Sequence, residues 1–278
     1  MKVGIQTGLT DVDQIADYCR QVNVYEIILS ASAIPGFSEK GFINSNSIGM
    51  FMDEIAQHGI KVSGMIPPNP SKEAVLGDNK DEVVNLCKSL QAIGEANIET
   101  VLFYPFDLFK NYLVEYHHEK PPLEVMPGEE KWNVIIKFFK LIADVAEEHN
   151  LNIANHVFAV NIMRQVLDEV KSSKLGITYC TGMYIFGNDP YAGIDIYGFE
   201  KIFLCHARNL IRHGPGRQGH EEVPLDSGDI DIARYVRNLI NAGYDGLVVP
   251  EHWGKAGNVV DSVAYLKKLL KEANHENH

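Results

Sequence analysis

Eight short apolar runs, each rich in β-branched residues, recur along the chain and alternate with stretches of helical period. The runs cover residues 3–7, 25–29, 60–66, 100–104, 151–156, 176–180, 202–206 and 246–251. Continuous apolar strands that alternate with helices are typical of parallel strands buried on both faces. Because the eight runs alternate strictly with eight helical stretches, the pattern predicts an α/β fold with a closed (β/α)8 barrel, or TIM barrel.

The length of the chain is consistent with one such barrel. It has 278 residues, and a (β/α)8 barrel typically takes about 250. The chain shows no break in composition, no low-complexity segment and no linker, so we expect residues 1–278 to form a single domain. A doubly wound open sheet is the alternative. However, the turn at residues 6–10 holds one glycine and lacks the glycine-rich phosphate motif of that fold.

Ordinary end signals flank several of the helical stretches. Thr10 with Asp13 resembles a capping box before the first helix. Gly59 and Gly243 lie just past helical patterns, where a left-handed residue commonly ends a helix. Asp231 is interpreted as part of the acidic N-terminus of a late helix. Three longer loops remain, at residues 30–44, 106–130 and 213–229. We interpret the middle loop as a solvated lid or an oligomer contact.

Charge and cysteine content argue against several classes of protein. With a formal net charge of −12, the chain has no basic stripe to displace counterions, so we expect no nucleic-acid partner and no anionic membrane partner. Its four cysteines form no CxxC pair and are too sparse for a disulfide framework, which is typical of reduced thiols. The first residues do not resemble a signal peptide, and no apolar stretch approaches the length of a membrane span. We therefore expect a soluble, cytoplasmic protein.

Four consecutive strand ends in the second half of the chain carry a residue that can bind a transition metal. The fifth to eighth runs end at His156, Cys180, His206 and Glu251. In a (β/α)8 barrel these ends meet at one face, where the loops after the strands build the active site. Two imidazoles, a thiolate and a carboxylate are a suitable ligand set for one ion.

A single histidine or cysteine at a strand end is usually a packed or hydrogen-bonded residue and not a ligand. Four matched strand ends weaken that interpretation for this set. Cys205 serves as an internal comparison, because it directly precedes His206 and its side chain must point to the other side of the strand. We therefore predict that Cys205 packs in the core, and that Asn155 likewise points away from His156.

Positive and polar residues after the seventh strand suit an anionic, hydroxylated ligand. Arg208 and Asn209 come directly after His206, and a glycine-rich loop with His220 and Glu221 follows. Arginine is the natural partner for a substrate carboxylate, because its planar fork binds both oxygens. The alternative is a flexible, solvated loop. We favour a functional role for Arg208 and His220 over one for the two arginines inside the loop.

Taken together, these segments resemble the mannonate dehydratase family, within the xylose isomerase-like TIM-barrel superfamily. The motifs that carry the resemblance are Tyr179-Cys180-Thr181-Gly182, Asn188-Asp189, His206-Ala207-Arg208-Asn209, His220-Glu221, Gly228-Asp229-Ile230-Asp231 and Pro250-Glu251-His252. They cover the last third of the chain, whereas the N-terminal half matches by fold only. The fifth strand departs from the family's His-Pro-Asp-Asp-Pro motif, Glu251 stands where the family has Asp, and Pro224 replaces an expected second His.

The resemblance implies a set of site residues and a metal. It implies an Mn²⁺ or Fe²⁺ ion held by His156, Cys180, His206 and Glu251, although a thiolate with two imidazoles also suits Zn²⁺. The catalytic residues that we predict are His252, His220 and Arg208. The substrate-binding residues that we predict are Arg208, Asn209, His220 and Glu221.

Three functions remain open at this point. The first is a hydro-lyase that converts D-mannonate to 2-keto-3-deoxy-gluconate and water, by metal-assisted removal of the C2 proton and loss of the C3 hydroxyl. The second is a sugar isomerase or epimerase on the same barrel, and the third is a non-catalytic barrel that binds a sugar acid. In each case we expect a small-molecule sugar acid or sugar as ligand, and a homo-oligomer, either a dimer or a tetramer.

Overall fold

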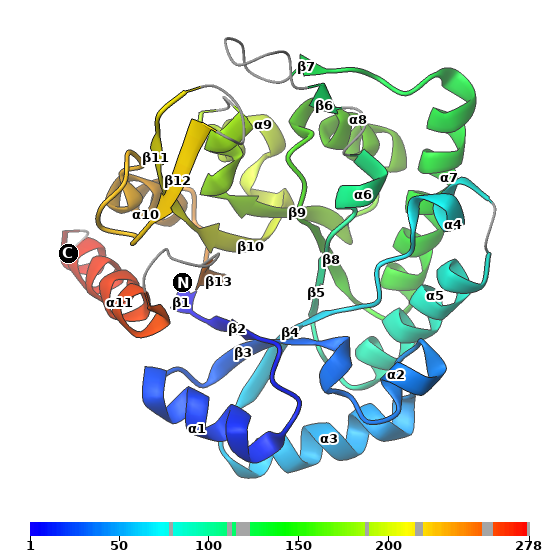
Figure 1. The fold of residues 1–278 in the computed structure, drawn as a ribbon, viewed down its shortest axis with the longest axis horizontal. Helices are drawn as coiled ribbons and strands as arrows, with labels where there is room; N and C mark the ends of the chain where they lie inside the picture. Colours follow the sequence, from blue (N-terminus) through cyan, green and yellow to red (C-terminus); the bar gives the residue numbers. More distant parts are fainter. Residues whose placement is uncertain are drawn as a thin grey trace.

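The computed structural model describes residues 1–77, 80–109, 113–114, 123–186, 189–214, 219–251 and 258–276. Its central feature is one parallel sheet with the strand order β1-β13-β10-β9-β8-β5-β4-β3-β2 (Figure 1). The first strand is divided at Gly4 into β1 (Lys2–Val3), which pairs with β13, and β2 (Ile5–Thr7), which pairs with β3. The same strand thus joins both edges of the sheet, and the predicted barrel is confirmed.

The remaining barrel strands agree closely with the apolar runs. They are β3 (Glu26–Ser30), β4 (Lys61–Ile66), β5 (Thr100–Phe103), β8 (Asn152–Asn155), β9 (Leu175–Cys180), β10 (Ile202–Ala207) and β13 (Leu247–Pro250). Each begins and ends within one residue of the predicted run. The agreement arises because strands buried on both faces must be apolar throughout, which makes them visible in the sequence.

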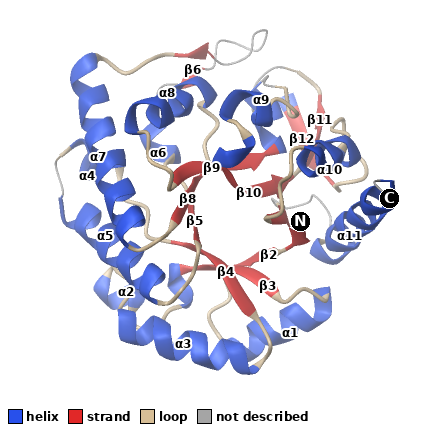
Figure 2. Cartoon of the chain, turned by 180° about the vertical axis from the view of Figure 1, so that it is seen from behind, coloured by secondary structure: helices blue, strands red, loops and turns tan. Residues whose placement is uncertain are grey.

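Helices surround the sheet on its outer side (Figure 2). They are α1 (Val12–Val22), α2 (Phe37–Lys40), α3 (Ser45–Gln57), α4 (Lys72–Leu76), α5 (Lys80–Glu95), α6 (Phe106–Phe109), α7 (Glu129–Glu148), α8 (Val160–Val170), α9 (Gly193–Tyr197), α10 (Ile232–Asn241) and α11 (Val259–Glu276). After the sixth barrel strand, the described residues form only the short α9 and the 3₁₀ segments η3 (Thr181–Phe186) and η4 (Phe199–Lys201) before β10. Another 3₁₀ segment, η1 (Ala31–Ala33), follows β3.

Most of the predicted helix ends are confirmed. Gly59 and Gly243 adopt φ values of +71° and +82°, each two residues after the last residue of α3 or α10. Asp231 caps α10 by accepting a hydrogen bond from Arg234 N at 2.8 Å. The capping box expected at Thr10 is wrong. Asp11 is the N-cap of α1 instead, because its backbone is extended and its carboxylate accepts from Gln14 N at 2.9 Å.

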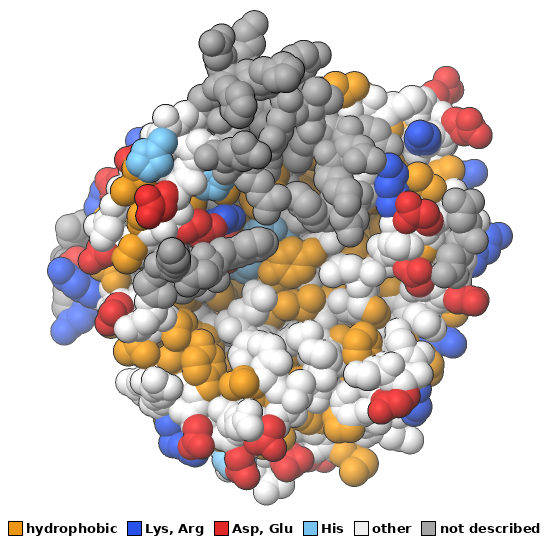
Figure 3. Space-filling view, viewed as in Figure 1, with side chains coloured by type: hydrophobic (Ala, Val, Ile, Leu, Met, Phe, Trp, Pro, Cys, Tyr) orange, Lys and Arg blue, Asp and Glu red, His pale blue; other side chains and the backbone are white. Residues whose placement is uncertain are grey.

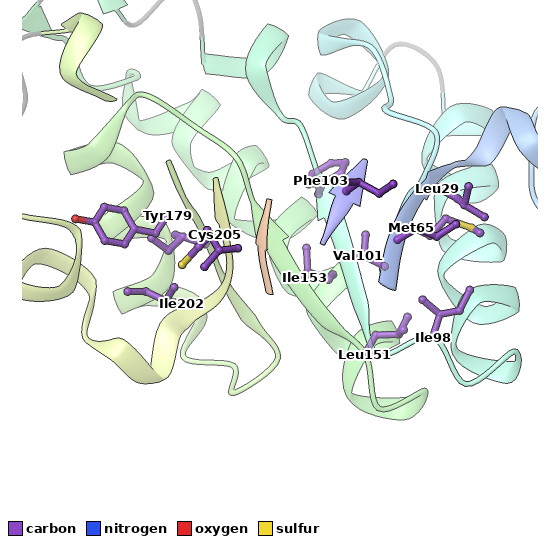
Figure 4. Close-up of a cluster of buried hydrophobic side chains, with 14 of the residues drawn as sticks. Leu29, Met65, Ile98, Val101, Phe103, Leu151, Ile153, Tyr179, Ile202 and Cys205 are labelled. Carbon is purple, nitrogen blue, oxygen red and sulfur yellow. The ribbon is translucent and has the colours of Figure 1, made fainter. Parts of the chain in front are cut away.

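Side chains alternate between the inside of the barrel and the helices outside it. Ile28, Leu102, Ala154, Leu204 and Val249 form an apolar cluster of their own, one from each of five strands. The residues next to them in sequence belong to the larger core, which lies between the strands and the helices. Figure 4 shows part of this larger core, including Leu29, Val101, Phe103, Ile153 and Cys205. The prediction that Cys205 packs in the core is confirmed, since it is fully buried there.

Among the residues that the structure describes, two small antiparallel sheets lie outside the barrel sheet. One pairs β6 (Leu113–Val114) with β7 (Leu123–Glu124), within the long loop predicted after the fourth run. The other pairs β11 (Asn209–Arg212) with β12 (His220–Val223). The second hairpin lies partly where we predicted only a loop, because its alternation is too short to stand out from the glycine-rich segment around it. Within the described ranges, no helix has the length and apolar character needed to cross a bilayer.

Candidate functional site

Strand alternation directs a ring of side chains into the mouth of the barrel. Each interior apolar residue of β8, β10 and β13 is followed, two positions later, by one of the predicted ligands. Ala154 precedes His156, Leu204 precedes His206, and Val249 precedes Glu251. Residues two apart on a strand point to the same face. The interior of the barrel is therefore apolar at depth and carries ionisable groups at its carboxyl end.

The four predicted ligands come together at this end. One potential ligand atom from each of His156, Cys180, His206 and Glu251 lies within 4.8 Å of all the others. Glu251 Oε2 is central: it accepts a hydrogen bond from Cys180 Sγ at 3.2 Å and lies 3.6 Å from His206 Nδ1 and 3.9 Å from His156 Nε2. The two imidazole rings are 5.1 Å apart between centroids. This spacing leaves room for one ion among the four side chains.

Hydrogen bonding in the cluster fits a metal site. Among the described residues, His156 Nε2 and both ring nitrogens of His206 are buried without a hydrogen-bond partner. Burying an imidazole nitrogen without a partner is costly, and His206 is completely inaccessible to solvent. A cation coordinated by one nitrogen of each ring would remove part of that cost. The donor set of two imidazoles, a thiol and a carboxylate also suits a transition metal.

The charges of the cluster are strongly coupled. Burial raises the pKa of Glu251, but His206, His156 and Arg208 outweigh it and hold the pKa of this carboxyl well below its usual range. Burial lowers the pKa of His156 to about 4, against the opposing attraction of Glu251. Burial and the nearby Glu251 carboxylate raise the pKa of the Cys180 thiol well above its usual range. The cluster therefore pairs a protonated thiol with an ionised carboxylate, and a metal would have to displace the thiol proton.

The segment after β9 holds Cys180 and Arg208 together. Gly182 N donates a hydrogen bond to Cys180 Sγ at 3.2 Å. Thr181 Oγ1 donates to Arg208 O at 2.6 Å and accepts from Arg208 N at 2.8 Å, so one hydroxyl after β9 holds both backbone groups of Arg208. The Arg208 side chain forms an ion pair with Glu222. Glu222 was not among the residues predicted for the site.

Asn209 lies at the site, but its amide is fully used by the backbone. Its Nδ2 donates to Leu225 O at 2.7 Å and to Ile230 O at 2.9 Å. Its Oδ1 accepts from Leu210 N at 2.9 Å and from Ile230 N at 3.0 Å. A Cβ on Gly228 would overlap Asn209 Oδ1, so the glycine makes room for this amide. These bonds favour a scaffold role for Asn209 over the substrate contact that we predicted.

Alternation along β12 separates the other predicted residues. His220 and Glu222 are partly buried on one face, whereas Glu221 points the other way and its side chain is 68% exposed, 3.6 Å from His213 Nε2. Since Glu222 contacts Arg208, His220 shares the face of β12 that is directed toward the site. Glu221 is therefore poorly placed for a substrate contact. His252 lies outside the described residues.

A cavity of about 490 Å³ opens beside the cluster. It is lined by Gln6, Thr7, Gly8, Tyr18, Tyr104, Pro250, Glu251 and Val259. Tyr104 connects it to the ligands, because its ring lies 5.1 Å from the His156 ring and its hydroxyl donates to Gln6 Oε1 at 3.3 Å. Figure 3 shows this face, where histidine, basic and acidic surface lies beside a hydrophobic patch near the centre. The cavity has room for a small hydroxylated molecule that reaches Glu251.

Gln6, Tyr104 and Glu222 were missed from the sequence. Gln6 and Tyr104 each stand at the inward position at the carboxyl end of a barrel strand, so strand alternation was a signal that pointed to both. Neither glutamine nor tyrosine is a usual transition-metal ligand, so the pattern of metal-binding residues at strand ends did not include them. No comparable signal marked Glu222, because its role depends on a hairpin that was not predicted.

Comparisons with known proteins agree with this architecture. The family model for the xylose isomerase-like TIM barrel matches residues 43–269. The mannonate dehydratase of Enterococcus faecalis is 28% identical over 132 residues, which cover 41% of this chain and 36% of that protein. The mannonate dehydratase of Oceanobacillus iheyensis is 26% identical over 280 residues, which cover 76% of this chain and 79% of that protein. This chain therefore spans about a third of the first relative and most of the second.

A solved structure extends the likeness to the whole fold. The crystal structure of mannonate dehydratase from Streptococcus suis serotype 2 superposes with a TM-score of 0.78 and 18% sequence identity, over 100% of this chain and 94% of that chain. At this level of identity the superposition establishes a shared fold.

Proposed function

Because this chain belongs to the xylose isomerase-like TIM barrel family, we propose that it is a metal-dependent hydro-lyase that removes water from a sugar acid of the mannonate type. The observation that carries the proposal is the buried cluster at the barrel mouth, in which four potential ligand atoms lie within 4.8 Å of one another. The similarity to mannonate dehydratases of two bacteria supports the choice of reaction and substrate class.

The proposed ligands are His156, Cys180, His206 and Glu251. When bound, a divalent ion would supply Lewis-acid chemistry by stabilising negative charge on substrate oxygens. The family resemblance favours Mn²⁺ or Fe²⁺, while the thiolate and imidazoles keep Zn²⁺ as an alternative. The buried imidazole nitrogens without hydrogen-bond partners among the described residues support this assignment of ligands.

Three residues of the chain would bind the substrate and move its protons. Arg208 would bind the carboxylate, because a guanidinium has five donors and can serve both Glu222 and a ligand. His220, on the same face of β12 as Glu222, would take the C2 proton. His252, outside the described residues, would act as the second acid or base, as the family resemblance implies. The cavity lined by Gln6 and Tyr104 would hold the hydroxylated chain.

The experiment is metal-by-metal reconstitution with a panel of hexonates. Protein stripped of metal is loaded with Mn²⁺, Fe²⁺ or Zn²⁺ and incubated with D-mannonate and its epimers, and the keto-deoxy acid is measured. We expect product with one or more of these ions, with loss of metal and activity in Cys180→Ala. Cys87→Ala is the matched control, since Cys87 lies on α5, away from the four-residue cluster.

Two results would contradict the dehydratase. Deuterium incorporated at C2 without loss of water would identify an isomerase or epimerase instead. Stoichiometric binding of a hexonate without turnover by any metal-loaded form would identify a binding protein. Absence of bound metal in the parent protein would contradict the ligand assignment itself.

A further inference from the structure

We propose that Glu222 is a positioning residue, which fixes the guanidinium of Arg208 beside the metal cluster. This proposal rests on the proposed function for its kinetic consequence, but its structural consequence can be measured without any substrate. It adds to the site a residue that is not one of the four predicted ligands.

Two hydrogen bonds fix the backbone of Arg208 next to the end of β9. The two hydrogen bonds with Thr181 Oγ1 hold both its N–H and its carbonyl. The side chain then lies against Gly182, where an added Cβ would be 2.9 Å from Arg208 Cδ, 2.9 Å from Nη1 and 3.1 Å from Cys180 Sγ. The guanidinium is therefore a close neighbour of a predicted metal ligand, and Gly182 provides the space for it.

The β11–β12 hairpin delivers Glu222 to this arginine. Leu210 pairs with Glu222 in the antiparallel register, and Arg208 directly precedes β11, two residues before Leu210, so the hairpin brings Glu222 close to Arg208. They form a direct ion pair, in which the Arg208 side chain is 6% exposed and that of Glu222 is 14% exposed. The Glu222 carboxylate therefore holds the guanidinium against the hairpin, and both charges are largely removed from water.

The main effect of this buried ion pair is to restrict the conformation of the Arg208 side chain. An arginine side chain loses rotamer freedom when it is held in one conformation. A guanidinium already fixed by Glu222 loses that freedom on folding and not on binding the substrate. Its remaining donors then meet a substrate carboxylate in a prepared orientation, which is how positioning residues support catalysis.

The test compares Glu222→Gln and Glu222→Ala with the conservative Glu222→Asp. Glu272→Gln is the control, because Glu272 is an exposed glutamate on α11 that lies 3.9 Å from Lys268. In the metal-loaded enzyme we expect Glu222→Ala to lower kcat/KM for the hexonate roughly 10- to 100-fold, as expected for a hydrogen bond to a charged group. We expect partial recovery in Glu222→Asp and an unchanged ratio of metal to protein in all variants.

A double-mutant cycle separates positioning from an independent role. If Glu222 acts through Arg208, then Glu222→Ala in an Arg208→Ala background should change kcat/KM by no more than about twofold. Additive losses in the double variant would overturn the proposal. Parent-like kcat/KM and hexonate affinity in Glu222→Ala would overturn it as well.

A substrate-free measurement keeps the inference separate from the proposed reaction. In protein labelled with ¹⁵N-arginine, the Nε–Hε signal of Arg208, assigned by its loss in Arg208→Ala, should report a rigid side chain. We expect it to become mobile in Glu222→Gln, a variant that retains the shape of the side chain. A rigid signal in that variant would refute the proposal even if the enzyme proves to be a dehydratase. A mobile signal would support it even if no hexonate is dehydrated.

Discussion

Replacing Asn209 with alanine tests whether this residue builds the site or binds the substrate. The substitution removes four hydrogen bonds between the side-chain amide and backbone groups. The amide nitrogen donates to Leu225 O and Ile230 O, and the amide oxygen accepts from Leu210 N and Ile230 N. Asn209 is 2% exposed, so water reaches these groups poorly in the parent structure. The variant would leave four backbone groups without their partners at the base of the hairpin.

The expected cost follows from the number of bonds. At about 1 kcal/mol for each buried backbone group that loses its partner, the lower end of the usual cost, the loss is about 4 kcal/mol of unfolding free energy. For a chain of 278 residues, the unfolding entropy is roughly 0.6 kcal/mol per kelvin, so the melting temperature should fall by about 7 °C. The hairpin that carries Glu222 and His220 should loosen first, because Asn209 joins it to the segment around Ile230.

The assay is urea and thermal unfolding followed by circular dichroism, with Asn241→Ala as the control. Asn241 is an exposed asparagine at the end of α10, where the same substitution should change stability by no more than about 0.5 kcal/mol. The reasoning would be refuted if Asn209→Ala unfolded within about 1 kcal/mol of the parent while its affinity for a hexonate collapsed. That outcome would return Asn209 to the substrate-binding role expected from the sequence.

Three further predictions concern the ion, the arginine and a helix end. Removing the bound ion with a chelator should lower the melting temperature by about 5 °C relative to protein at 100 times the metal Kd, since such binding stabilises by about 2.7 kcal/mol; equal melting temperatures would contradict a metal site. Gly182→Ala should displace Arg208, lower stability by about 1–3 kcal/mol and lower kcat/KM, and parent-like values in urea unfolding and kinetics would show that the close approach is not required. Asp231→Ala should cost about 1 kcal/mol, because Arg234 N loses its capping carboxylate, and calorimetry showing no loss would exclude that cap as a contributor.

Local periodicity explains why the barrel was predictable. Each buried strand must be apolar along its whole length and each covering helix must carry one apolar stripe, so both leave a pattern within a few residues. Strand alternation then determines which residue at each strand end faces inward. This is why His156, His206 and Glu251 could be chosen correctly as neighbours, while Cys205 was assigned to the core.

Contacts between segments outside the regular pattern were not predictable in the same way. Glu221 and Glu222 are adjacent and chemically equal, and only the register of β12 against β11 directs the second toward Arg208 and leaves the first in solvent. The roles of Asn209 and Gly228 depend on a loop that folds back over the amide.

The sequence alone determined the class of fold and the four side chains that meet at the mouth of the barrel. Both depend on local periods in the sequence, two residues for strands and 3.6 for helices. Because the barrel strands are parallel, their carboxyl ends lie on one face and bring the inward side chains together. The tertiary structure decided which of the remaining polar residues serve the site. The partners of Arg208, Asn209 and Tyr104 lie on segments that are distant in the sequence. Contacts between such segments depend on the register of the hairpin, on buried backbone groups and on close packing.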